Sequence, residues 1–124
     1  MKKVLVVEDD DSLRLLYTSE LSDDGYEVLP VSCGDEALEV FKEKKPDLVV
    51  LDIRLSGMSG LEILGEMLKV KKDIHVVINS AYPNFQREFA TWGADAYLVK
   101  SSDTSVLRET VKSILEEKPA STSV

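Results

Sequence analysis

Five residues whose side chains can bind cations or phosphate follow short apolar runs in this sequence. They are Glu8, Asp9, Asp52, Ser80 and Lys100. Apolar runs of this length that end in polar residues are typical of buried parallel strands. Because the carboxyl ends of parallel strands meet at one edge of a sheet, we expect these five side chains to surround one crevice.

These residue types together suit phosphoryl chemistry. Crowded carboxylates raise each other's pKa unless a cation neutralises them, and their hard oxygen ligands suit Mg²⁺. A lysine and a hydroxyl on the other side of the crevice would stabilise the oxygens of a phosphoryl group. Asp52 then becomes the nucleophile, because one carboxylate oxygen can bind the metal while the other attacks phosphorus in line. The sequence therefore predicts a Mg²⁺-dependent phosphoryl acceptor.

The elements that must position these residues alternate strictly between strand and helix. Apolar runs predict five strands, at 4–7, 26–31, 48–51, 74–80 and 96–100. Helical spacing and capping residues predict five helices, at about 12–24, 34–45, 59–72, 85–92 and 104–115. This order predicts an α/β fold, a doubly wound five-stranded parallel sheet with the five helices on both faces. Pro30 favours an edge position for the second strand, because proline cannot donate a ladder hydrogen bond.

Length and composition restrict the classes of function. A chain of 124 residues suits one domain, which we assign to 1–118, and the small polar residues 119–124 predict a disordered tail. The formal net charge of −8 argues against direct binding of nucleic acid, so we expect protein partners. The apolar runs are too short for a membrane span or a signal peptide, and the single cysteine cannot form an internal disulfide. A cytoplasmic protein without membrane contact is expected.

Five segments match the motifs of one family, in the family's order and near its spacing. They are VLVVEDD at 4–10, DLVVLD at 47–52, GMSGLE at 57–62, SAY at 80–82 and GADAYLVK at 93–100. Through them, residues 2 to about 117 resemble the response-regulator receiver domain of bacterial two-component signal transduction, in the CheY-like superfamily. The resemblance implies a flavodoxin-like sheet with strand order 2-1-3-4-5, which agrees with an edge position for the second strand.

The resemblance also implies roles for the acidic residues. Asp52 matches the phosphoacceptor of the family, and Asp9 matches a direct Mg²⁺ ligand. Glu8 corresponds to a ligand that acts through water, and Arg54 to one that acts through its backbone carbonyl. The cofactor implied is therefore Mg²⁺.

Further residues match the family's catalytic and switching positions. Lys100 and Ser80 correspond to groups that stabilise the phosphoryl oxygens, and Ser80 with Tyr97 corresponds to the switch pair, whose ring is expected to turn inward on phosphorylation. Arg54 and Tyr82 match the side chains that flank the path of the hydrolytic water. Both are large, so we expect them to slow hydrolysis of the acyl phosphate.

The implied partners are proteins. The resemblance predicts that Asp52 receives its phosphoryl group from a histidine kinase or a histidine phosphotransfer protein. The signal would leave through the helix at 85–92, the strand at 96–100 and the helix at 104–115, towards a downstream protein or a second copy of the chain. Such a domain catalyses only its own phosphorylation and dephosphorylation, so it is not an enzyme with a separate substrate.

The chain departs from the family's pattern at four places. Ser56 stands where proline is frequent, and Ser101 stands where a cis-proline usually follows the lysine. The segment between Ser80 and Gly93 is a residue or two shorter than usual, and the first acid is Glu8 instead of the commoner aspartate.

Two other functions compete with phosphorylation control. The departures from the pattern are compatible with a receiver-like interaction module that works independently of phosphorylation. A metal-dependent phosphohydrolase of the haloacid-dehalogenase type would also use Asp52 as a nucleophile. Such enzymes need a second acid two residues later, where Arg54 stands, and a cap domain for which this chain is too short.

Overall fold

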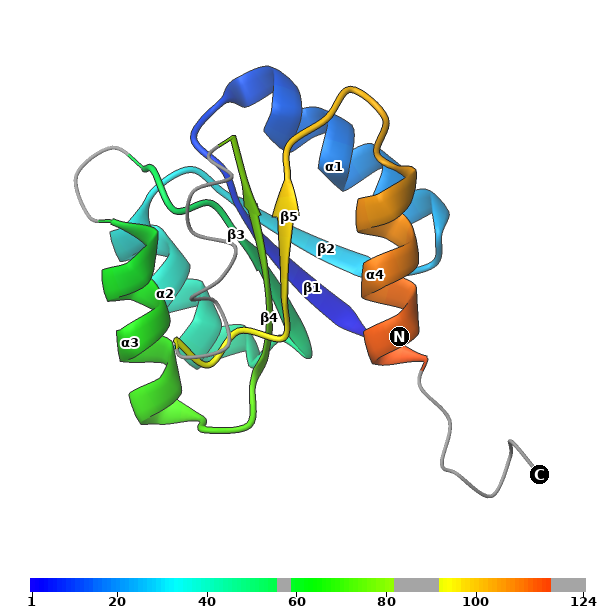
Figure 1. Cartoon of the computed structure of the whole chain (residues 1–124). Coiled ribbons are helices and arrows are strands. Elements are labelled where there is room, and N and C mark those ends of the chain that lie inside the picture. Colours follow the sequence, from blue (N-terminus) through cyan, green and yellow to red (C-terminus); the bar gives the residue numbers. More distant parts are fainter. Residues whose placement is uncertain (56–58, 82–91, 117–124) are drawn as a thin grey trace.

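The structure is a computed structural model that describes residues 1–55, 59–81 and 92–116. Its centre is a five-stranded sheet with the order β2-β1-β3-β4-β5, in which all four pairs of neighbouring strands are parallel (Figure 1). The sequence-based prediction of a doubly wound parallel sheet, and the order implied by the family resemblance, are both confirmed.

The strands are short, and the central ones are buried on both faces. They are β1 (Lys3–Val7), β2 (Glu27–Val31), β3 (Leu48–Leu51), β4 (His75–Ser80) and β5 (Ala96–Val99). Every residue of β3 is buried, as the uninterrupted apolar run predicts for a strand that is covered on both sides. β2 lies at one edge of the sheet and Pro30 is exposed there, which confirms the edge position.

The helices cover the two faces of the sheet in pairs. They are α1 (Asp11–Asp23), α2 (Gly34–Lys44), α3 (Gly60–Val70) and α4 (Ser105–Leu115). α1 and α4 lie on one face of the sheet, and α2 and α3 lie side by side on the other (Figure 1). Each pair closes a separate apolar core, one around Tyr17, Leu21 and Val111 and one around Phe41, Ile63 and Met67. Because helices cover both faces, the inner strands β1, β3 and β4 are almost entirely buried, whereas the edge strands β2 and β5 are partly exposed.

Four helices occur among the described residues, so the five expected are confirmed only in part. The helix expected at 85–92 lies almost entirely outside the described residues, as does the tail at 119–124. The first helix begins at Asp11, one residue before the expected start at about 12, and the side chain of Asp10 caps it by accepting a hydrogen bond from Leu13 N. Among the described residues, no helix is long and apolar enough to span a membrane.

Candidate metal-binding and phosphoacceptor site

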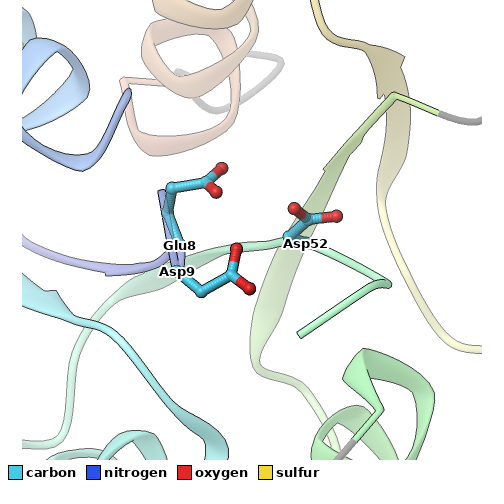
Figure 2. A group of neighbouring side chains, drawn as sticks. All are labelled: Glu8, Asp9 and Asp52. Atoms are coloured by element: carbon cyan, nitrogen blue, oxygen red, sulfur yellow. The ribbon is translucent and has the colours of Figure 1, made fainter. Parts of the chain in front are cut away.

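Three carboxylates meet at the carboxyl edge of the sheet. Glu8 and Asp9 follow β1, Asp52 follows the neighbouring β3, and one oxygen of each lies within 4.8 Å of the others (Figure 2). Parallel pairing of β1 with β3 brings the strand ends together, and Asp52 N donates to Val7 O at 3.3 Å. Glu8 is 2% exposed and Asp52 is 5% exposed, whereas Asp9 is exposed. The expected acidic cluster therefore forms, with one carboxylate open to solvent.

Lys100 reaches into this cluster from the end of β5. Its Nζ lies 2.8 Å from Oε1 of Glu8 and 2.7 Å from Oδ2 of Asp52. Burial by itself lowers the pKa of the lysine, but the hydrogen bonds to Asp52 and Glu8 outweigh it and raise the pKa to about 12. The peptide bond between Lys100 and Ser101 is trans, since no cis peptide occurs among the described residues. The lysine therefore reaches the acids in this structure without the proline that usually follows it in the family.

Glu8 is the most deeply buried of the three acids. Removal from water raises its pKa, and the hydrogen bonds from Lys100 and from Asp10 N, the latter at 3.1 Å, act in the opposite direction. A buried carboxylate needs such partners to remain charged. Glu8 is thus held in place by its two hydrogen bonds, which leaves Asp9 as the carboxylate that solvent reaches most easily.

The charges and ligand atoms of this cluster fit a divalent cation. With Lys100 protonated and the three acids ionised, two negative charges remain in a small volume. Carboxylate oxygens are the hard ligands that Mg²⁺ prefers, and an exposed acid such as Asp9 gives an ion access from solvent. The observed donor set is therefore suited to Mg²⁺.

The backbone after β3 fixes the direction of Asp52. Arg54 N donates to its Oδ1 at 3.2 Å, so Oδ1 and Oδ2 are held by different groups, the first by the backbone and the second by Lys100. Gly60, at the start of α3, packs against the same segment, and its N donates to Ile53 O at 2.7 Å. A Cβ atom at Gly60 would lie 2.1 Å from the carbonyl oxygen of Asp52. The start of α3 therefore requires glycine in order to approach the backbone of Asp52.

Residues 4–112 match the family model of the response regulator receiver domain. The match covers most of the 124 residues, starting within β1 and ending within α4. The chain belongs to this family.

Individual receiver proteins are similar over nearly the whole chain. Sporulation initiation phosphotransferase F of Bacillus subtilis is 33% identical over 119 residues, which are 94% of this chain and 96% of that protein. The solved structure of response regulator TrrA from Thermotoga maritima, in complex with Mg²⁺ and BeF, is 42% identical with a TM-score of 0.86, and the match covers 92% of this chain and 99% of that one.

A second structure shows TrrA together with the histidine kinase ThkA. Its match to this chain has 43% identity and a TM-score of 0.84, and covers 93% of this chain and 99% of that one. Other relatives, among them transcriptional regulators, are longer, and the chain spans about half of their length.

The two residues expected to form the switch pair, Ser80 and Tyr97, lie in the neighbouring strands β4 and β5. Ser80 ends β4 and is fully buried, and its carbonyl oxygen accepts from Lys100 N at 2.7 Å. Tyr97 lies in β5 and is 7% exposed, within the core that α2 and α3 cover. The ring is thus buried in this structure, and a change in its packing on phosphorylation stays a prediction. Tyr82, expected on the water path, lies outside the described residues, and the side chain of Arg54 is exposed.

The sequence analysis missed two features near the acidic cluster, one at Arg14 and one at Tyr17. Arg14 Nη1 donates to the carbonyl oxygen of Glu8 at 2.9 Å, which ties α1 to the acidic turn. Arg14 lies six residues after Glu8 and in the first turns of the expected helix, and this spacing could have indicated a contact between the two residues. Tyr17 hydrogen-bonds Asn79, and burial raises the pKa of its phenol. This pair lies on the face of the sheet that α1 covers, and no sequence pattern links its members.

Proposed function

We propose that this receiver domain accepts a phosphoryl group on Asp52 in a Mg²⁺-dependent reaction and thereby switches a protein-interaction surface. The observation that carries the proposal is the position of Asp52. It is 5% exposed, has Lys100 Nζ 2.7 Å from Oδ2, and lies within 4.8 Å of the ligand atoms of Glu8 and Asp9. The Mg²⁺ and BeF named with TrrA, and its complex with a histidine kinase, support both the cofactor and the donor.

Asp9, Asp52, Glu8 and the backbone carbonyl of Arg54 would hold the Mg²⁺ ion, with Glu8 acting through water. When bound, the ion supplies positive charge that stabilises the phosphoryl oxygens. The short contact of Glu8 with Lys100 supports an indirect role for Glu8, because that carboxylate already has a cationic partner.

The chemical step is transfer from a phosphohistidine of a histidine kinase or a histidine phosphotransfer protein. A carboxylate oxygen of Asp52 forms a bond to phosphorus, the phosphorus–nitrogen bond breaks, and its electron pair returns to the imidazole. Lys100 and the Ser80 hydroxyl stabilise the phosphoryl oxygens, since Lys100 contacts Asp52 directly and Ser80 ends β4, the strand next to β3. The domain thus catalyses its own phosphorylation and dephosphorylation and processes no other substrate.

The output is a change of packing transmitted from Ser80 to Tyr97. A phosphoryl group on Asp52 adds oxygen acceptors near Ser80. The populations of two conformations that differ in the packing of Tyr97 then shift towards the one in which the phosphoryl group is bound better. The responding surface would comprise residues 85–92, β5 and α4, and would contact a downstream protein or a second copy of the chain. A cytoplasmic location follows from such partners, and neither nucleic acid nor membrane would be contacted directly.

The experiment is incubation with acetyl phosphate and Mg²⁺ followed by intact-mass measurement. We expect one added phosphoryl group in the wild type and none in Asp52→Asn, because an amide is a neutral, poor nucleophile. Asp47→Asn is a matched control, since that carboxylate lies before β3 at the other end of the strand. Equal labelling of wild type and Asp52→Asn would reject the phosphoacceptor. No labelling of either would favour the alternative, an interaction module that works independently of phosphorylation.

A further inference from the structure

A hollow of about 380 Å³ lies at the opposite edge of the sheet from Asp52, where α2 and α3 end. Six residues line it: Phe41, Lys42, Lys45, Pro46, Val70 and Lys71. Pro46 lies just before β3 starts, whereas Asp52 follows the end of that strand, so the two sites lie at opposite ends of one strand. This separation means that the hollow has no part in the phosphoacceptor site.

The floor of the hollow is apolar and partly open to water. Phe41 is 3% exposed and Pro46 is buried, and they form a base on which a ligand can rest. Val70, at the last position of α3, is 54% exposed and is among the few large apolar side chains that the structure leaves in water. Covering this side chain would remove apolar surface from water, which favours binding of an apolar group.

The rim of the hollow is positively charged, unlike the chain as a whole. The sequence has 23 acidic against 15 basic residues, yet three of the six lining residues are lysines and none is acidic. All three lysines are exposed, and within the described part of the chain none of them forms an ion pair. A rim of three unpaired ammonium groups in an acidic protein is complementary to an anionic group.

The lysines around the hollow all lie at helix C-termini, where cations are favourable. Lys42, Lys44 and Lys69 are in the last turns of α2 and α3, and Lys45 and Lys71 are the C-caps of these helices. Lys44 and Lys69 are paired with acids of their own helices, Glu43 and Glu66. The lysines that line the hollow differ from them, because their charges have no such partner in the described residues.

We propose that this lysine-rimmed hollow binds a small amphiphilic carboxylate. An apolar body, such as one aromatic ring or a short alkyl chain, covers Val70 above Phe41 and Pro46. The carboxylate lies among Lys42, Lys45 and Lys71. The volume is near the lower end of small-ligand pockets, and an apolar lining with a few charged groups is typical of them.

The test uses the ¹⁵N-labelled full chain and 4-phenylbutyrate as the probe. We expect saturable shifts of the amide signals of residues 41–45 and 70–71, with a dissociation constant on the order of millimolar for so small a ligand. The alcohol 4-phenylbutanol should bind about three- to tenfold more weakly, because its head group attracts lysines less. The amine 4-phenylbutylamine should bind more weakly still. Equal binding of the three compounds, or shifts scattered over the whole chain, would overturn the proposal.

Two sets of variants with the same change in net charge separate specific from general attraction. In the first triple variant, the three lysines of the hollow are replaced: Lys42→Gln, Lys45→Gln and Lys71→Gln. Its affinity for 4-phenylbutyrate should fall to that for the alcohol. The second triple variant, with Lys44→Gln, Lys69→Gln and Lys112→Gln, should bind 4-phenylbutyrate as tightly as the wild type. An equal loss in both sets would mean that only the total charge matters, and the proposed site would be rejected.

Two further measurements complete the test. Val70→Ser should weaken the binding of the acid and of the alcohol by the same factor, since it removes part of the apolar surface that the ligand covers. If this variant bound both compounds like the wild type, the proposed pose would be contradicted. Signals of the same residues that move when the protein concentration is raised without probe would identify a second copy of the chain as the occupant instead. Asp52→Asn should bind the probe like the wild type, so the result does not depend on phosphorylation.

Discussion

Lys100 joins two acids from different strands, with its Nζ 2.7 Å from Asp52 and 2.8 Å from Glu8. The sequence separation between Lys100 and Asp52 is 48 residues, and the contact exists because β5 and β3 both flank β4. One ammonium group thereby neutralises part of the negative charge of this cluster. A Mg²⁺ ion bound as we propose would share these carboxylates with the lysine.

Replacing Lys100 should separate metal binding from phosphorylation. In Lys100→Met, the site is more negative, so we expect Mg²⁺ to bind more tightly, whereas labelling by acetyl phosphate should become slower because the phosphoryl oxygens lose a cation. Without Mg²⁺ the variant should lose about 1–3 kcal/mol of unfolding free energy, since Glu8 stays buried without its ion-pair partner. Mg²⁺ titration, labelling rates and urea melts measure the three effects. Weaker Mg²⁺ binding would show that the lysine supports the metal site instead of competing with it.

Asp9 should be needed for the metal and dispensable for the fold. Asp9→Asn removes the most exposed of the three carboxylates, so we expect Mg²⁺ affinity to fall by about tenfold or more. The metal-free protein should be equally or slightly more stable, because one source of like-charge repulsion is gone. Titration with Mg²⁺ and thermal melts without it test both parts, with Asp10→Asn as the neighbouring control. An unchanged affinity in Asp9→Asn would transfer the ligand role to another acid.

Gly60 should position Asp52 through its missing side chain. In Gly60→Ala, the new Cβ would lie 2.1 Å from Asp52 O and 2.7 Å from Ile53 Cα, both backbone atoms that cannot move alone. We expect a loss of about 1–3 kcal/mol in unfolding free energy and slower labelling of Asp52. Gly65→Ala is the control on the same helix, because nothing lies within 4 Å of its Cβ. That change should stabilise the protein by up to about 1 kcal/mol. Similar behaviour of the two variants would refute the positioning role.

The pairing of Arg108 with Asp24 should make stability depend on acid pH. Arg108 Nη2 lies 2.6 Å from Asp24 Oδ1, and hydrogen bonding to the guanidinium lowers the pKa of that carboxyl below its usual 3.8. A lowered pKa in the folded state contributes stability above the unfolded value, which is lost as the pH falls through the folded value. Asp24→Asn should therefore have a lower Tm than the wild type at about pH 7, and the difference should shrink below about pH 3.8. A difference in Tm that is constant over this range would contradict the ion pair.

Local pattern in the sequence was sufficient for the strands and for the acids at their ends. An apolar run followed by Asp52 or by Glu8 predicts a buried strand with an acid at its carboxyl end. Because the strands of a parallel sheet share one direction, the run also predicts that both acids lie at the same edge of the sheet. The edge position of β2 was equally readable, since Pro30 lacks the N–H that an inner strand needs. These features depend on neighbours in the chain, and the structure confirms them.

Contacts between distant segments were decided only by the tertiary structure. Whether Lys100 reaches Glu8 as well as Asp52 depends on the strand order, which family resemblance supplied and local pattern did not. The hydrogen bond from Arg14 to the Glu8 carbonyl depends on the angle at which α1 leaves β1, and the need for glycine at position 60 depends on how closely α3 approaches β3. Each of these contacts is set by the packing of whole elements across the sheet, whereas sequence periodicity reports only which face of an element is buried.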